Sequence, residues 1–346
     1  MTRSRLTSLV AWSRLVLLAL AMGPCVAAAQ APQPSPYAID IPSWFAETFL
    51  DFREDVADAA RDHKRLLVYF GQDGCPYCRQ LMVNNFSQRR IVDKTRAHFV
   101  AIALNIWGDR ETTWLDGKSR SEKELARFLE VQFTPTLLFF DERGNVVARL
   151  NGYYPPDRFE AVLDYVADHR ESTEPLRDYL ARHATPRAGA RLNDETFFLA
   201  APLDLATRAH DKPLAVLFET ADCAPCDELH RDAFRRPEVL AQLQRFDVVR
   251  FGLAAPTMLT TRDGRRVTAR EWARELDIAY VPTLVLFAPD GREALRVDAY
   301  LRAFHLASAL EYVAGGAYRE EPSFQRYIQT RAQRLRDRGQ PVELWE

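Results

Sequence analysis

The sequence predicts an α/β protein made of two tandem domains that share one order of strands and helices. Apolar runs with strand character alternate with amphipathic helical patterns in the order β-α-β-α-β-β-α, which is typical of a sheet covered by helices. The whole order then occurs a second time at almost constant spacing, and three landmarks are repeated: Cys75, Cys78 and Pro135 return as Cys223, Cys226 and Pro282. A chain of 346 residues also suits two domains of ordinary size.

The first repeat is expected to begin with an amphipathic helix over residues 43–61. Ser43 is a suitable N-cap, and Phe45, Phe49 and Phe52 recur on one helical face. The later elements follow from the same periodicities and from a Gly-containing hairpin turn. They are a buried strand over 66–70, a helix from Cys78 to about Phe86, a strand over 98–106, a helix over 122–131 with Leu125, Phe128 and Leu129 as its apolar stripe, a hairpin of 133–140 and 146–150, and a helix over 157–169.

The same signals divide the chain into segments. Residues 1–29 are predicted to be a secretory signal peptide, because early arginines precede a short apolar core and a small-residue cleavage site after Ala29. An uncleaved membrane anchor is the alternative. Residues 30–42 are Pro-rich and expected to be an extended linker. The remaining predicted segments are domain 1 over 43–184, a linker over 185–195, and domain 2 over 196–346 with a C-terminal helix and tail.

The cysteines point to chemistry rather than to structural staples. Removal of the signal peptide leaves four cysteines, and all four lie in the two Cys-x-x-Cys pairs. Each pair follows a strand and starts a helix, where the amide dipoles stabilise a thiolate on the first cysteine. Cys75 and Cys223 are therefore predicted to be nucleophiles, with Cys78 and Cys226 as more buried resolving partners in thiol–disulfide exchange.

Other functions are less well supported by the residues. A zinc site needs a second ligand pair nearby, and only His230 lies close to a cysteine pair. His230 is expected to be a solvated helix residue, with a role in proton transfer as the alternative. A structural disulfide is a further alternative. No flavin or nicotinamide motif is present, so no cofactor and no metal are predicted. A net charge of −2 gives no indication of nucleic-acid binding.

Taken together, these motifs resemble the thioredoxin fold, a central mixed β-sheet flanked by helices. The resemblance rests on strand, Cys-x-x-Cys, helix, strand, helix, and then Thr134-Pro135-Thr or Val281-Pro282-Thr before a hairpin and a last helix. It implies that both prolines are cis and face the cysteine pairs. It also implies that Thr134 and Val281 offer their backbone to an extended substrate strand.

A finer resemblance is to SoxW-type periplasmic thioredoxins, which are linked to sulfur-oxidation systems. It rests on Cys75-Pro-Tyr-Cys78, the insert around Trp107-Gly-Asp-Arg, and Gly315-Gly-Ala-Tyr-Arg-Glu-Glu-Pro. Cys-Pro-Tyr-Cys is also the glutaredoxin dithiol sequence, but the inserted helix favours the thioredoxin layout. The chain departs from thioredoxin in one respect: Tyr69 and Leu217 stand where that family buries an acidic residue, six positions before the first cysteine.

These features predict an exported, periplasmic thiol–disulfide oxidoreductase that reduces or isomerises disulfides of proteins or small thiols. Electrons would come from a membrane donor of the DsbD/CcdA type. A net disulfide oxidant and a non-catalytic chaperone or binding module are the alternatives. The acidic residues Asp222, Asp227 and Glu228 are expected to raise the thiol pKa of the second pair, so the two sites are expected to differ in redox potential.

Overall fold

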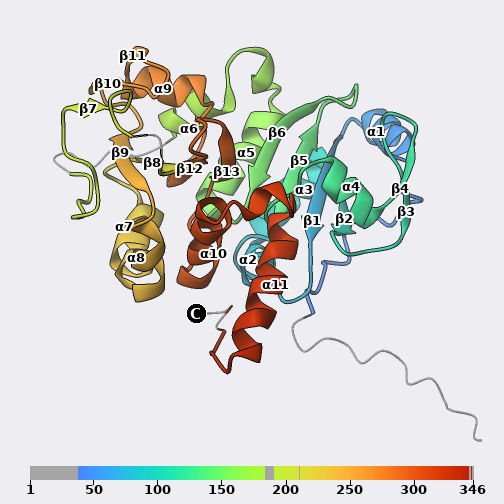
Figure 1. Cartoon of the computed structure of the whole chain (residues 1–346). Helices are drawn as coiled ribbons and strands as arrows, with labels where there is room; N and C mark the ends of the chain where they lie inside the picture. Colours follow the sequence, from blue (N-terminus) through green and yellow to red (C-terminus); the bar gives the residue numbers. More distant parts are fainter. Residues whose placement is uncertain (1–37, 184–190, 210, 343, 345–346) are drawn as a thin grey trace, which may run out of the picture. The chain divides into compact units, whose positions relative to one another are not determined.

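The computed structural model describes residues 38–183, 191–209, 211–342 and 344. The predicted signal peptide over 1–29 lies outside these residues, as do parts of the two predicted linkers. Residues of both repeats belong to one compact unit. Each repeat contains a four-stranded mixed sheet between helices, which confirms the predicted fold class (Figure 1).

The elements of the first repeat follow the predicted order with some additions. They are α1 (Phe52–Arg61), β1 (Arg65–Gly71), α2 (Pro76–Gln80), the π-helical turn η1 (Leu81–Asn85), α3 (Arg89–His98), β2 (Phe99–Asn105), β3 (Glu111–Thr113), β4 (Ser119–Ser121), α4 (Glu122–Phe128), β5 (Thr136–Phe140), β6 (Val146–Asn151), α5 (Pro156–Ala167), η2 (Arg170–Ser172) and α6 (Leu176–Arg182).

The second repeat has closely corresponding elements. They are β7 (Leu203–Asp204), β8 (Leu214–Glu219), α7 (Ala224–Arg231), η3 (Ala233–Arg235), α8 (Pro237–Leu243), β9 (Asp247–Gly252), β10 (Met258–Thr260), β11 (Arg266–Thr268), α9 (Ala269–Glu275), β12 (Thr283–Phe287), β13 (Glu293–Val297), α10 (Ala303–Ala314), η4 (Ala317–Arg319) and α11 (Phe324–Asp337).

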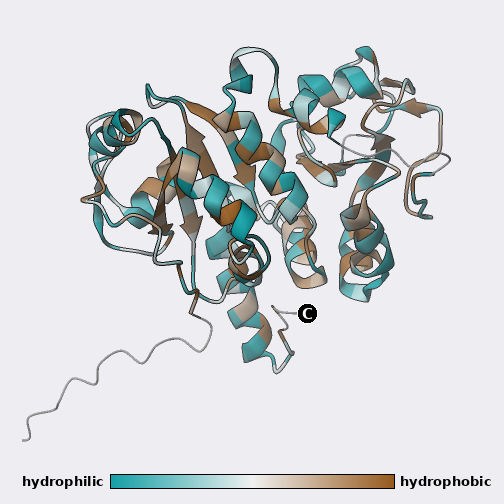
Figure 2. Cartoon of the chain, turned by 180° about the vertical axis from the view of Figure 1, so that it is seen from behind, coloured by the Kyte–Doolittle hydropathy of each residue, from teal (hydrophilic) through white to brown (hydrophobic). Residues whose placement is uncertain are grey.

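The central sheets have the strand orders β2-β1-β5-β6 and β9-β8-β12-β13. In each sheet the second strand pairs in parallel with the first and antiparallel with the third. Every residue of β1 and β8 is buried, because each strand lies between two neighbours and between two layers of helices. Figure 2 shows these strands as hydrophobic and the outer helix surfaces as hydrophilic. The apolar runs therefore mark central strands, as the periodicity predicts.

The two repeats are joined by packing as well as by the chain. One cluster of buried side chains contains residues from one face of the first sheet together with residues of the second repeat. Within it the rings of Tyr154 and Tyr280 lie 4.1 Å apart. Nearby, the Asn151 amide donates a hydrogen bond to Asp298 Oδ2 at 3.0 Å. The repeats thus share part of their core.

The predicted helix over 43–61 is wrong in its first half. Helix α1 begins only at Phe52, and Asp51 is its N-cap in place of Ser43. Residues before it pair with strands instead: Ala46 N–H donates to the Ala101 carbonyl, and Leu50 accepts from Thr113 N–H. The φ angle of Leu50 is 61°, which is incompatible with a continuous helix.

Two phenylalanines expected in apolar stripes are also exposed. Phe49 lies outside α1 and is 99% exposed, whereas Phe52 is fully buried. Phe128, at the end of α4, is 51% exposed and carries the Arg120 guanidinium 4.0 Å above its ring. Helical spacing alone did not separate these side chains from the core residues beside them.

Truncation of Phe139 tests the importance of the shared core. Phe139 is fully buried in β5 and packs edge-on against Phe99. We expect Phe139→Ala to lower the free energy of unfolding by about 3–5 kcal/mol, because it leaves a cavity in a close-packed core. Urea denaturation followed by circular dichroism measures the change. Phe49→Ala is the matched control, and we expect it to stay within about 0.5 kcal/mol of the unmodified chain.

Candidate active site

The first cysteine pair lies where β1 gives way to α2. After the strand, Gly74 has a φ angle of 75°, a conformation that favours glycine, and the chain turns into Cys75. Cys75 is the N-cap of α2, and its Sγ accepts a hydrogen bond from the Cys78 N–H at 3.0 Å. Pro76 fills the first helical position, where no N–H is needed. Cys75 and Cys78 form a disulfide.

The second pair has the same local geometry. Cys223 is the N-cap of α7, and its Sγ accepts from the Cys226 N–H at 3.0 Å. Cys223 and Cys226 form a disulfide. In both pairs the first cysteine is the more exposed: 3% against 0% in the first repeat, and 6% against 1% in the second. A sulfur at a helix N-terminus that accepts an amide hydrogen bond is suited to carry negative charge.

The proline loops meet the cysteine pairs as the resemblance implies. The peptide bonds before Pro135 and Pro282 are both cis. In the first repeat the Thr134 hydroxyl donates to Cys75 Sγ at 3.3 Å, and the Thr134 carbonyl oxygen lies 3.4 Å from the same sulfur. In the second repeat Val281 packs against the cysteine pair without a hydroxyl group. Each site therefore gathers its own two cysteines and the residue before its cis-proline, but among the described residues only the first site has a side-chain hydroxyl that donates to the sulfur.

Beneath the second site lies a buried acid–base cluster that sequence analysis missed. His230 is 3% exposed, so the expectation that it is a solvated helix residue is wrong. Its Nε2 lies 3.0 Å from Glu219 Oε1, and its Nδ1 lies 2.9 Å from Glu195 Oε1. Arg235 donates two hydrogen bonds to Glu195. Because His230 follows Cys226 by one helical turn, both lie on the inward face of α7.

The cluster changes the protonation of the histidine. Burial on its own would lower the pKa of His230, but hydrogen bonds and charge interactions with Glu219 and Glu195 raise that pKa above its ordinary value. The second carboxylate oxygen of Glu219 has no hydrogen-bond partner among the described residues. Glu219 is thus a buried carboxylate on the strand that carries the cysteine pair.

The first repeat has no carboxylate at the matching place. Gly71 and Met82 correspond to Glu219 and His230. A side chain at Gly71 has no room, since a Cβ there would lie 1.9 Å from the Tyr69 hydroxyl. That hydroxyl is buried without a hydrogen-bond partner in the described part of the chain. Strand β8 does carry a buried acidic residue, but it is Glu219, two positions after Leu217. Because Leu217 and Glu219 share one face of the strand, period-two spacing was the available signal for it.

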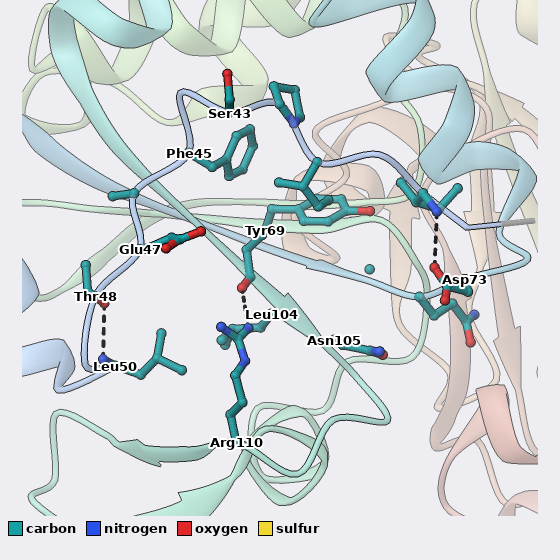
Figure 3. A pocket seen from close by; sticks show the side chains of 17 residues that line it. Ser43, Phe45, Glu47, Thr48, Leu50, Tyr69, Asp73, Leu104, Asn105 and Arg110 are labelled. Atoms are coloured by element: carbon teal, nitrogen blue, oxygen red, sulfur yellow. Dashed lines mark hydrogen bonds between the residues drawn. The ribbon is translucent and has the colours of Figure 1, made fainter. Parts of the chain in front are cut away.

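Tyr69 also lines a pocket of about 420 Å³ next to the first site. The segment around Phe45 forms one wall, and the ends of β1 and β2 form another. Figure 3 shows the Tyr69 ring beside Phe45, with its hydroxyl directed toward the side where Asp73 lies. Asp73 itself accepts a hydrogen bond from Ile39 N–H. The pocket therefore lies behind the turn that leads to Cys75.

The two sites differ most in what covers the turn between their cysteines. In the first site Pro76 and Tyr77 are buried. In the second site Ala224 is exposed and Pro225 is half-buried. The same motif is therefore covered in one repeat and open to solvent in the other.

The described residues contain neither a candidate metal centre nor a candidate membrane span. No group of three or more His, Cys, Asp or Glu side chains in that part of the chain is arranged to hold a metal ion. No helix there is long and apolar enough to cross a bilayer.

The fold and the two sites are of the thiol–disulfide oxidoreductase type. The family model of the thioredoxin-like domain matches residues 52–167 and again residues 203–314. The chain therefore belongs to the thioredoxin-like domain family and carries that domain twice.

Parts of the chain are also similar to solved structures with the thioredoxin fold. The chain is similar to a thioredoxin-fold protein from Helicobacter pylori, with 27% identity over 35% of this chain and 80% of that chain and a TM-score of 0.31. It is also similar to a thioredoxin from Thermus thermophilus, with 28% identity over 34% of this chain and 83% of that chain and a TM-score of 0.27. The assignment to the thioredoxin-like domain family therefore rests on the family model and not on these two structures. No curated protein matches the chain.

Replacement of His230 tests the buried cluster. Because the folded-state pKa of His230 is raised, its stabilising contribution is fully present below the ordinary histidine pKa of about 6.5 and is lost as the pH rises through the folded-state value. We expect His230→Gln to cost about 3–5 kcal/mol of unfolding free energy at pH 6, the cost of breaking a buried ion pair, and clearly less at pH 9.

Urea unfolding at both pH values measures this difference. His98→Gln is the control, since His98 lies exposed at the end of α3. A cost of His230→Gln that is equal at both pH values would contradict the assigned protonation.

Proposed function

We propose that this protein is an exported thiol–disulfide oxidoreductase that reduces or isomerises disulfides. One observation supports this most directly: in each repeat the cysteine pair caps a helix and lies beside the residue that precedes a cis-proline. The pairing brings together a sulfur nucleophile, a resolving thiol and the loop that the thioredoxin resemblance implies for substrate binding.

The geometry supports a definite order of steps. In the reduced form, the thiolate of Cys75 or Cys223 attacks a substrate disulfide and forms a mixed disulfide, releasing one substrate thiolate. The thiolate of Cys78 or Cys226 then attacks the first cysteine's sulfur. The second substrate thiolate leaves, takes up a proton, and the Cys-x-x-Cys disulfide forms. Two electrons pass from the protein dithiol to the substrate in each cycle.

Electrons must return to the site from another dithiol. A membrane donor of the DsbD/CcdA type is the partner that fits an exported protein without a flavin or nicotinamide motif. The resemblance to SoxW-type thioredoxins supports a role in sulfur oxidation or cytochrome maturation. Both proposals depend on export to an oxidising compartment where a dedicated reductant is needed.

Insulin reduction with dithiothreitol tests the enzymatic proposal. We expect Cys75→Ser/Cys223→Ser to lower the rate of insulin precipitation at least about 100-fold, toward the rate with dithiothreitol alone, because neither site can start an exchange. Cys223→Ser alone is expected to have the larger single effect, since its turn is the exposed one.

Ala224→Ser, which changes the exposed turn but no sulfur, is the control and should retain activity within about two-fold. An unchanged rate in the double variant would rule out an enzyme of this type. Equilibration of each pair with glutathione gives its potential, and a value near about −120 mV would show a net oxidant instead of a reductase.

Cell fractionation and N-terminal sequencing test the proposed export. We expect the full chain, expressed in a Gram-negative host, to be periplasmic and to begin at Gln30, because signal peptidase cleaves after small residues such as Ala29. A chain that starts at Gln30 behind a new initiator Met is the control and should stay in the cytoplasm. An uncleaved chain in the membrane fraction would instead show an N-terminal anchor.

A further inference from the structure

The first site is closed to an extended substrate strand by the second repeat. Phe133 and Gln132, which directly precede Thr134, contact the start of α11. The rings of Phe133 and Phe324 lie 5.3 Å apart, and the Gln325 amide donates to the Gln132 carbonyl at 2.9 Å. Thr134 is expected to offer its backbone to a substrate strand and is itself 5% exposed. The approach to this backbone is therefore covered by this chain's own helix α11 (Figure 1).

More hydrogen bonds fasten α11 at this place. The Gln132 side chain accepts from Phe324 N–H at 2.8 Å and donates to the Pro322 carbonyl at 3.0 Å. Gln72, which also donates to the Thr134 hydroxyl, donates to Gln325 Oε1 at 2.7 Å. Gln325 is buried and Gln72 and Gln132 are half-buried, so these hydrogen bonds add to the apolar contact in holding α11 over the first site.

A second segment of the same repeat covers the turn between Cys75 and Cys78. The Tyr77 hydroxyl accepts a hydrogen bond from Arg302 N–H at 2.8 Å. The ring of His305 packs edge-on against Tyr77 at 5.2 Å. Tyr77 is 5% exposed as a result. The corresponding turn of the second repeat has Ala224 and Pro225, and Ala224 is exposed, so the cover depends on Tyr77 as well as on the segment packed against it.

A small cavity remains next to the sulfur under this cover. Its volume is about 140 Å³, and its walls include Cys75, Thr134, Tyr300 and Gln325. A cavity of about 150 Å³ accepts a molecule the size of benzene, whereas drug-sized ligands occupy about 300–1,000 Å³. The space therefore suits one half of a small disulfide and not a polypeptide segment.

The charges around the cavity further limit the class of small disulfide that it suits. Among the described residues that line it, Asp73 is the one carboxylate, and there is no lysine or arginine. Burial, with a smaller effect from Arg302, lowers the pKa of His305 to about 4, so this ring is neutral at pH 7. An anionic disulfide such as that of glutathione would find no cation in these walls. Neutral or cationic small disulfides fit better.

We propose that the first site reacts with neutral or cationic low-molecular-weight disulfides, and that protein disulfides react at the second site. This assignment rests on the proposed oxidoreductase function. Reduced Cys75 attacks the small disulfide R–S–S–R and releases one R–S⁻. Cys78 then displaces the second R–S⁻, and both anions are protonated. The protein loses two electrons and forms the Cys75–Cys78 disulfide, and a low-molecular-weight dithiol that enters the same cavity reduces it again.

Two variants of the full chain separate the sites. Cys223→Ser/Cys226→Ser leaves only the first site, and Cys75→Ser/Cys78→Ser leaves only the second. Each is reduced, freed of reductant and mixed with hydroxyethyl disulfide, glutathione disulfide or insulin, and the loss of protein thiols is followed by alkylation. We expect both variants to react with hydroxyethyl disulfide within about ten-fold of each other. With insulin and with glutathione disulfide, the first site should be at least about 100-fold slower than the second.

Variants of the cover then test its role in the first-site background. Phe324→Ala/Gln325→Ala, which removes part of the cover and part of the cavity wall, should raise the insulin rate at least about ten-fold. Gln329→Trp, which places a large ring at the cavity wall from an exposed position, should slow hydroxyethyl disulfide at least about ten-fold. Gln333→Ala, on the exposed side of α11, is the matched control and should change neither rate. Circular dichroism verifies that each variant is folded.

The outcomes distinguish the two proposals. If the first site reacts with insulin as fast as the second, or does not react with hydroxyethyl disulfide while the second site does, the assignment is wrong and the proposed function stands. Rates that respond to neither cover variant would also overturn it. If neither site reacts with any disulfide, the oxidoreductase function itself is wrong, and the assignment fails with it.

Discussion

Each candidate site depends on a strand that is buried along its whole length. β1 and β8 are enclosed on both faces, so a one-residue shift in register would move every side chain to the opposite face and disrupt the packing on both. The end of each strand is thereby held in place, and Cys75 and Cys223 start their helices with Sγ in reach of a backbone N–H. The cis-proline loops precede β5 and β12, which pair with the same two strands. The pairing that forms the core thus also sets the distance between sulfur and loop.

The two repeats share this arrangement of strands, but different side chains surround the cysteine sulfurs in each. The first site has the Thr134 hydroxyl on its sulfur and a buried Tyr69 in place of a carboxylate. The second has an apolar neighbour in Val281, with Glu219 and His230 beneath the helix. The first turn is also covered by another part of the chain, while the second is open. Duplication has therefore kept the exchange machinery and changed the polarity and access of each copy.

Much of this was predictable from residue patterns. Strand-like runs, Cys-x-x-Cys spacing and the repeated proline are local signals, and they led to the fold class and to both groups of site residues. The helix predicted from Ser43 failed because the backbone of residues 43–50 pairs with strands distant in sequence, which helical periodicity does not report. His230 was placed in solvent for a similar reason. A histidine four residues after a cysteine is on the same helix face, but its burial depends on Glu219 and Glu195 from other segments.

Short-range spacing is enough to predict the duplicated α/β fold, the strand-to-helix position of each cysteine pair and the prolines that meet them. The accessibility of each site, in contrast, follows from contacts between segments that are distant in the chain. Cys75-Pro-Tyr-Cys78 and Cys223-Ala-Pro-Cys226 are equivalent as motifs, yet α11 and the segment around Arg302 lie over the first. Those contacts join residues some two hundred positions apart. They are favourable because Phe133, Phe324 and Tyr77 are all buried by them. No local pattern encodes such a contact.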